Sequence, residues 1–205
     1  NRLDITHLDG GAVGAPMFGR DAERKKKYDL EHTGYLQGSE LAKGLTAGGY
    51  RTELKEGYNK PIFNFNAENA PQIPQGTTCT KAIFNFSNAY FSTFTYDEAS
   101  KVYKKQHSGT PQIDSSTGNQ LSFTNVIALK TDITMRDSRN GLLNIALNSG
   151  VGKYISNGMC EDIKWSKADE NSPIVLAKAD GTPLSINAGK SYIGIIGNDK
   201  LVSIQ

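Results

Sequence analysis

The sequence predicts a mainly β protein with a minor α component (α+β), built as an antiparallel sandwich or a curved, barrel-like sheet with a small N-terminal α/β remnant. Three observations predict it. Between residues 140 and 204, five short apolar runs are separated by turn signals at nearly even spacing. Asn157-Gly158 and Asp180-Gly181 stand between such runs, and both dipeptides tolerate the positive φ angles of two-residue type I′ hairpins. From residue 79 onward, apolar and polar residues alternate with the period of two that is typical of strands.

Composition narrows the class of protein. The 205 residues, 37% of them hydrophobic, are enough for one large domain or two small ones. With 23 basic and 21 acidic side chains the net charge is +2, which lacks the basic excess of nucleic-acid-binding proteins, so we expect no nucleic-acid partner. The basic cluster at 20–27 fits a solvated face better than a phosphate or membrane patch. No apolar run approaches the ~20 residues of a membrane span.

The first third of the sequence predicts little regular secondary structure. Residues 3–8 alternate like a strand, and the glycine-rich turn at 9–16 lacks the spacing of a phosphate-binding loop. Residues 40–47 are the best helix candidate, with Ser39 as cap, Glu40 at the positive end and Gly48-Gly49 as the stop. A weaker helix, without an apolar stripe, is expected at 20–27.

The rest of the chain predicts strands. Residues 61–66 read as one, and the unpatterned segment 67–78, with two prolines and a glycine, is the expected boundary between subdomains. Residues 91–96 and 101–105 are expected to pair as a hairpin, followed by strands at 120–123 and 125–131. In total, nine or ten strands are expected.

Cysteine and histidine usage indicates no metal or cofactor. Cys79 and Cys160 are far apart and outside metal-ligand spacing. They are either two buried thiols or a single bridge between strands. The three histidines, His7, His32 and His107, are scattered, which disfavours a zinc site.

A series of landmarks occurs in a defined order from residue 94 onward. In sequence they are Tyr96-Asp97, VYKK at 102–105, QID at 112–114, TGNQ at 117–120, TNVI at 124–127, GVGKY at 150–154, Asn157-Gly158, DIKWSK at 162–167, DGTPL at 180–184 and NAGKSY at 187–192. Together they resemble the C-terminal domain of the YerB-like lipoproteins, a bacterial family of unknown function. Residues 4–7, 10–11, 18–20 and His32 ahead of a short helix are similar to the end of that family's first domain.

The resemblance implies two parts and a location. Residues 1–70 would be the C-terminal part of an N-terminal α/β domain, and residues 79–205 an antiparallel β domain. The family's signal peptide, lipid-bearing cysteine and arginine-rich signature have no counterpart in this sequence, and Asn1 is not an initiator residue. We therefore expect a trimmed piece of an extracytoplasmic lipoprotein, held at the membrane only through the lipid anchor of the full-length form. Its missing N-terminal segment is then one candidate partner.

The candidate catalytic residues are Asp97, Asp114 and His32. Each aspartate sits where a turn selects it for backbone bonding. If both faced one cleft, they could form the acid and base pair of a glycosidase, which needs carboxyls ~5 to 9.5 Å apart. His32, with Asp29 or Glu31 nearby, is a candidate general base, although no nucleophile signature accompanies it.

The candidate binding residues are the polar and aromatic side chains that recur among the landmarks. They are Arg20, His32, Tyr103, Lys105, Asn125 and Trp165, with Lys167 beside the last. Strand alternation puts Trp165 on one face with Met159, Glu161 and Ile163. Trp165 is then either a core anchor whose indole N–H meets a carbonyl, or an exposed platform for a sugar or peptide.

We expect, from these observations, an extracytoplasmic binding or interaction module whose partner is a cell-wall glycan or peptide, or an envelope protein. The alternative is an envelope glycan hydrolase, directed at peptidoglycan, that uses the paired carboxylates or the histidine base. Convergence of the candidate groups in one pocket would separate the two.

Overall fold

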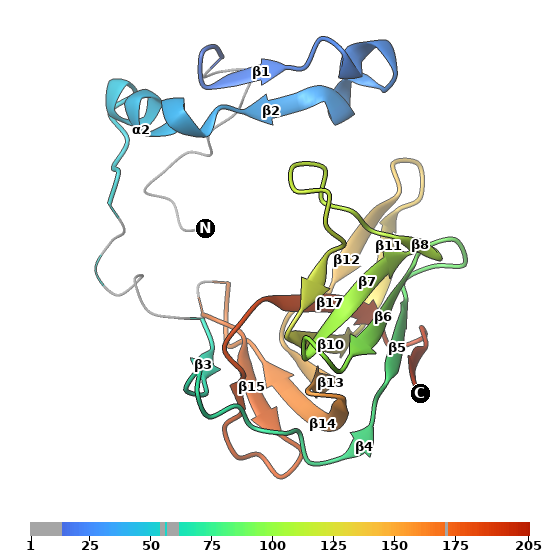
Figure 1. Cartoon of the computed structure of the whole chain (residues 1–205). Helices are drawn as coiled ribbons and strands as arrows, with labels where there is room; N and C mark the ends of the chain where they lie inside the picture. Colours follow the sequence, from blue (N-terminus) through green and yellow to red (C-terminus); the bar gives the residue numbers. More distant parts are fainter. Residues whose placement is uncertain (1–13, 54–55, 57–61, 171) are drawn as a thin grey trace. The chain divides into compact units, whose positions relative to one another are not determined.

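The chain forms two compact units, Asn1–Lys60 and Pro61–Gln205 (Figure 1). The computed structural model describes residues 14–53, 56, 62–170 and 172–205. The strand expected at 3–8 and most of the glycine-rich turn lie outside the described residues. The segment 67–78, where we expected a boundary, belongs to the second unit, so this division falls ahead of it.

The first unit is a short hairpin and a helix. Strands β1 (Phe18–Arg20) and β2 (Gly34–Leu36) pair antiparallel, with the 3-10 turns η1 (Arg24–Lys26) and η2 (Leu30–Thr33) between them. Residues 20–27, expected as a weak helix, therefore form a strand end and one short turn. The polar, charged sequence there offers no apolar stripe that could support a longer helix.

Helix α2 (Gly38–Ala47) is the helix that the sequence predicts at 40–47. It begins two residues earlier than expected. The extended residue Gln37 occupies the N-cap position without a side-chain bond, so Ser39 lies inside the first turn and is not the cap. Glu40 is in that first turn and Gly48 ends the helix, as predicted.

The second unit contains two six-stranded sheets and two smaller pairs (Figure 1). The sheet that we call the β14 sheet consists of β4 (Thr77–Thr78), β10 (Asn125–Thr131), β13 (Ser149–Ser156), β14 (Met159–Ser166), β15 (Val175–Lys178) and β17 (Ser191–Gly197). The β6 sheet consists of β5 (Lys81–Asn85), β6 (Phe91–Asp97), β7 (Val102–His107), β8 (Thr110–Pro111), β9 (Ser122–Phe123) and β18 (Val202–Ile204). The pairs are β11 (Ile133–Asp137) with β12 (Leu142–Ile145), and β3 (Asn64–Phe65) with β16 (Ser185–Ile186).

The predicted fold class, mainly β with minor α, is confirmed. The hairpin of β6 and β7 and the strand β10 lie where the sequence predicts them. Two details differ. None of the sheets closes into a barrel within the described residues. Two pairings, β10 with β17 and β3 with β16, are parallel instead of antiparallel. The parallel pairing of β17 with β10 follows from the path of the chain, because Lys190, the residue before β17, lies next to the start of β10. The Lys190 carbonyl accepts the N–H groups of Thr124 and Asn125 there.

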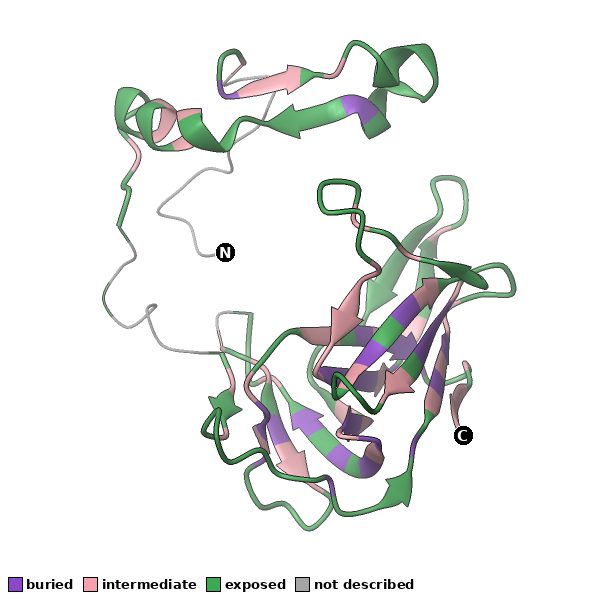
Figure 2. Cartoon of the chain, viewed as in Figure 1, coloured by how far each residue is buried: buried purple, intermediate pink, exposed green. Residues whose placement is uncertain are grey.

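The core lies on both faces of the β14 sheet. One buried cluster fills the space between the two sheets, and it contains Cys79, Ala82, Phe84, Phe94, Tyr103, Val126, Ala128, Ile155, Cys160 and Ile196. The other covers the opposite face with Ile127, Leu129, Tyr154, Ile163, Trp165, Leu176, Leu184 and Ile186. Strand β10 is therefore buried on both faces, and its run of buried residues differs from the alternation of β5 and β14 (Figure 2). Among the described residues, no helix has the length and apolarity to cross a membrane.

The turns at Asn157-Gly158 and Asp180-Gly181 differ in loop length. Asn157 and Gly158 both have positive φ (49° and 74°) and directly join the paired residues Ser156 and Met159, so the predicted two-residue hairpin is confirmed. At Asp180-Gly181 only Gly181 has positive φ. The Lys178 N–H bonds the Thr182 carbonyl at 2.8 Å, which makes a three-residue loop, so the two-residue prediction is wrong there. The Asp180 carboxylate instead accepts the Thr182 N–H at 2.9 Å, as aspartate does in turns.

We predict that Gly158→Val destabilises the protein more than Gly109→Val does. Both positions have positive φ, which a β-branched residue strongly disfavours. A Cβ at Gly158 would also lie 2.9 Å from the Tyr96 ring, whereas Gly109 faces open space. We expect the first variant to lose roughly 2 to 4 kcal/mol and the second about 1 to 3. Thermal unfolding measures the difference, and an unchanged melting temperature for Gly158→Val would contradict the turn geometry.

Candidate functional site

The Asp97 carboxylate makes its contacts within the hairpin of β6 and β7. It ends β6, forms an ion pair with Lys104 on β7, and accepts the Ala99 N–H at 3.2 Å. The hydrogen bond from Lys104 lowers the pKa of this carboxyl. These contacts match the turn role that was one of its two interpretations.

Asp114 is occupied in the same way. One of its oxygens accepts the N–H groups of Ser116 and Thr117, at 3.0 and 2.8 Å, and the Thr117 hydroxyl at 3.0 Å. The bond from the Thr117 backbone is the main reason that the pKa of Asp114 is lowered. A glycosidase needs one carboxyl whose pKa is raised so that it stays protonated. The pKa values of Asp97 and Asp114 are both shifted the other way.

Arg20 and His32 lie in the first unit. The Arg20 guanidinium donates to the Leu30 carbonyl, and the Arg24 side chain donates to the His32 carbonyl at 3.0 Å. These bonds fix the two 3-10 turns. The His32 side chain itself is exposed.

Tyr103 and Lys105 are buried on β7. The Tyr103 hydroxyl donates to the Cys79 carbonyl at 2.8 Å, and burial raises the pKa of Tyr103. The Lys105 ammonium donates to the Gln112 side chain and lies 5.4 Å from the centre of the Tyr192 ring. Burial lowers the pKa of Lys105. Both polar ends are therefore used inside the fold.

Asn125 belongs to a buried polar network whose members are too far apart in the sequence to be recognised as a unit. Its amide donates to the Asn187 carbonyl at 2.7 Å, and its oxygen accepts the Tyr154 hydroxyl at 2.9 Å. The Asn187 side chain bonds the backbone of Gln72 twice and Ser156 once. The NAGKSY landmark that begins at Asn187 was the available signal, but its partners are distant in the sequence.

Trp165 is a core residue, with 2% of its surface exposed. Its indole N–H donates to the Lys130 carbonyl at 3.0 Å. Gly150, its cross-strand neighbour, makes this possible, because a Cβ there would lie 2.2 Å from the Lys130 carbonyl and 2.7 Å from the indole nitrogen. The structure thus places Trp165 as the anchor of one core and not as an exposed platform.

The cysteines are both free thiols and both buried. Desolvation raises the pKa of Cys79 to about 11 and that of Cys160 to about 12, so neither is a thiolate near neutral pH. Of the two alternatives left open by the sequence, two buried thiols are present and the bridge is not. Among the described residues no group of three or more His, Cys, Asp or Glu side chains is placed to hold a metal ion.

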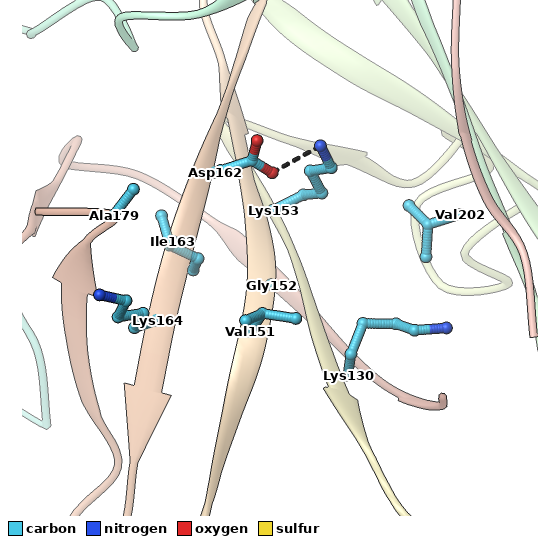
Figure 3. A pocket seen from close by; sticks show the side chains of 9 residues that line it. All are labelled: Lys130, Val151, Gly152, Lys153, Asp162, Ile163, Lys164, Ala179 and Val202. Carbon is cyan, nitrogen blue, oxygen red and sulfur yellow. Dashed lines mark ion pairs between the residues drawn. The ribbon is translucent and has the colours of Figure 1, made fainter. Parts of the chain in front are cut away.

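A groove opens where the β6 sheet stops covering the β14 sheet. The face of β13 and β14 that carries Ile155 and Cys160 into the core continues away from the hairpin turn with exposed or half-buried residues, which are Lys153 and Val151 on β13 and Asp162 and Lys164 on β14. This depression, of about 410 Å³, is bordered by Val202 of the β6 sheet (Figure 3). Its charged lining is Lys130, Lys153, Lys164 and Asp162. We call it the lysine groove.

The three lysines differ in how they are held. The Lys130 ammonium donates to the Gly197 carbonyl at 2.6 Å and to the Lys200 carbonyl, and burial lowers the pKa of Lys130. Lys153 forms an ion pair with Asp162 at 2.6 Å (Figure 3), and that hydrogen bond raises the pKa of Lys153. Lys164 is exposed and makes no hydrogen bond or ion pair with the described residues. It is therefore the available cation of the lysine groove.

Neighbouring depressions extend this groove. One of about 500 Å³ shares Lys153, Asp162 and Ala179 with it. A smaller one, of about 240 Å³, shares Gln75, Glu161 and Lys178 with the second. Strand alternation that puts Trp165 on one face of β14 puts Asp162 and Lys164 on the other, and this alternation is the signal that could have pointed to the site. Alternation could not predict where along β14 the β6 sheet stops covering it.

Comparison with known proteins identifies a family and a fold. Residues 82–193, more than half of the chain, match the model of a family described as "Protein of unknown function (DUF3048) C-terminal domain". The chain is also similar to the crystal structure of YerB protein from Bacillus subtilis, with a TM-score of 0.75 and 20% sequence identity. That match covers 96% of this chain and 62% of the other, so the chain spans less than two thirds of its structural relative. A search of curated proteins gave no match.

We predict that Trp165→Ala destabilises the protein by roughly 3 to 5 kcal/mol, because it removes buried area and leaves a cavity. Trp165→Phe keeps most of the packing but loses the bond to Lys130, and should cost less. Chemical denaturation measures both. The wild-type emission should be blue-shifted and poorly quenched by acrylamide; emission like that of indole in water would contradict the core position.

We also predict that the Asp114 carboxyl titrates below its ordinary pKa of ~3.9. Because this pKa is depressed in the folded state, the stability it contributes is present above the unfolded pKa and is lost as the pH falls through the folded one. Carbon-detected NMR titration measures the midpoint. Thr117→Ala, which removes one donor, should raise it. A wild-type midpoint above ~3.9 would favour an acid catalyst instead.

Proposed function

Because the chain belongs to the DUF3048 family of proteins of unknown function, whose C-terminal domain it contains, we propose that it is a binding module of the cell envelope and not an enzyme. The observation that carries this proposal is the contrast between two sets of residues. The candidate catalytic aspartates are occupied within their own turns and His32 lies exposed on the first unit, whereas Lys164 in the lysine groove is exposed and makes no hydrogen bond or ion pair with the described residues.

The lysine groove suits an anionic ligand with some apolar surface. Its apolar border comes from Val151, Ala179 and Val202, and Lys164 supplies the positive charge. Such a border removes ligand surface from water, while a few polar groups fix its orientation. Carboxylate-bearing peptide or glycan of the cell wall has this chemistry, and it is the partner that we propose.

The location outside the cytoplasmic membrane is likewise a proposal, supported by the resemblance to lipoproteins. In it, the full-length form is attached by a lipid anchor, and further partners are an envelope protein or the segment that precedes this region in longer relatives. Fractionation of cells that express the full-length precursor, followed by protease treatment of intact cells, tests the location. Recovery of the protein in the cytosolic fraction would contradict it.

The second candidate is a glycan hydrolase that uses Asp97 and Asp114 or His32. Turn bonding of both carboxylates weighs against it. The deciding assay is incubation of the full-length precursor with labelled cell-wall material. Release of product that Asp114→Asn abolishes would replace the binding proposal by the enzymatic one.

We predict that soluble cell-wall fragments containing sugar and peptide bind the protein and that Lys164→Ala weakens this binding about 5- to 10-fold, equal to about 1 to 1.4 kcal/mol. Lys190→Ala is the matched control, because Lys190 is also exposed on the second unit but does not border the groove. Isothermal titration calorimetry at low and high salt measures the affinities. Equal affinity of the two variants would rule out the lysine groove as the site.

A further inference from the structure

The outer edge of β14 has a gap in its pairing. Strand β4 pairs with this edge only at Met159 and Cys160, and the pairing with β15 begins at Ile163 of β14. Between them, Glu161 and Asp162 have no strand partner on this side. The Gly158 carbonyl, two positions before Cys160, accepts a bond from Cys79 on this same side. Because N–H and C=O groups of alternate residues point the same way in a strand, the backbone groups of Asp162 point into the gap.

The Glu161 carboxylate lies beside this gap and is short of partners. Only 7% of Glu161 is exposed. It has one hydrogen bond with the described residues, from the Gln75 N–H at 3.4 Å, which is a long distance for such a bond. A buried carboxylate normally has several strong donors or a cation beside it. Glu161 lines the depressions of about 500 and 240 Å³, so a ligand in either can reach it.

We propose that this gap is a second subsite, which binds the free ammonium group of a short peptide. Glu161 accepts the ammonium, and the Asp162 backbone pairs with the adjacent peptide bond of the ligand as a strand would. Ile73, Pro74 and Leu184 line the smaller depression and cover the first side chain. The inference rests on the proposed binding function and adds to it the polarity and the chemical class of the ligand.

The ammonium subsite is separate from the lysine groove. Strand alternation directs Glu161 to the face of β14 that carries Ile163 and Trp165, whereas Lys164 lies on the face that carries Cys160. The edge of β14 at Lys164 is also paired with Ala177 of β15. A short peptide in the gap is therefore held by its ammonium end alone.

The test uses trialanine, which carries both charges, together with its N-acetylated form and its C-terminal amide. NMR titration of the labelled protein should shift the amide signals of Gln75, Asp162 and Ala179 on addition of trialanine. N-acetylation should weaken binding at least 10-fold, because it removes the charge that Glu161 accepts. The C-terminal amide should bind about as well as trialanine, because the subsite accepts the ammonium end of the peptide.

Two variants complete the test. Glu161→Gln should bind trialanine and its acetylated form with similar, low affinity, whereas Glu98→Gln, an exposed control in the β6–β7 turn, should keep the preference for the free ammonium. If Glu161→Gln fails to fold, the comparison of free and acetylated peptide on the wild type still decides. Equal affinity for those two peptides, or no binding of trialanine, overturns the subsite. Binding of cell-wall fragments that depends on Lys164 would then still stand for the proposed function.

Discussion

The second unit depends on one buried amide, the side chain of Asn187. It donates to Ser156 on β13 and to the Gln72 carbonyl, and it accepts from Asn66 and from the Gln72 N–H. No buried side-chain polar atom among the described residues lacks a partner. Each of these bonds, if lost, would leave a buried group whose desolvation costs about 1 to 3 kcal/mol. The amide thus holds the segment at 66–72 against the β14 sheet, and this positions Gln75 next to Glu161.

The candidate site follows from a mismatch in the extent of the two sheets. On one face of β14, Cys160 is buried beneath the β6 sheet, whereas Asp162 and Lys164 on the same face are exposed. Burial decides which residue types are tolerated, because an unpaired lysine beneath a sheet would be strongly destabilising. The same strand therefore supplies core at one end and a charged groove at the other, and the groove needs no element of its own.

Local patterns predicted the local parts of this fold. Alternation identified β6, β7, β13 and β14, and the Asn157-Gly158 turn was recognised because its geometry is encoded in two adjacent residues. Alternation also placed Trp165 on the face that is buried. Parallel pairing of β10 with β17 could not be read in this way, since it joins residues 66 positions apart and leaves no trace in the period of either strand. The lysine groove and the Glu161 gap could not be predicted from the sequence for the same reason, because both are formed where strands distant in the sequence end.

Strand β18 pairs with β5, the first strand of the β6 sheet, and Gln205 exchanges backbone bonds with Lys81. During synthesis, β5 leaves the ribosome more than a hundred residues before its partner is made. Until then its edge is open, and an open edge is a template for pairing with other chains. Domains rich in such long-range pairing fold slowly and are exposed to aggregation while they wait. Nascent chains of this protein therefore have a period of vulnerability that ends only when residues 202–205 are free of the exit tunnel.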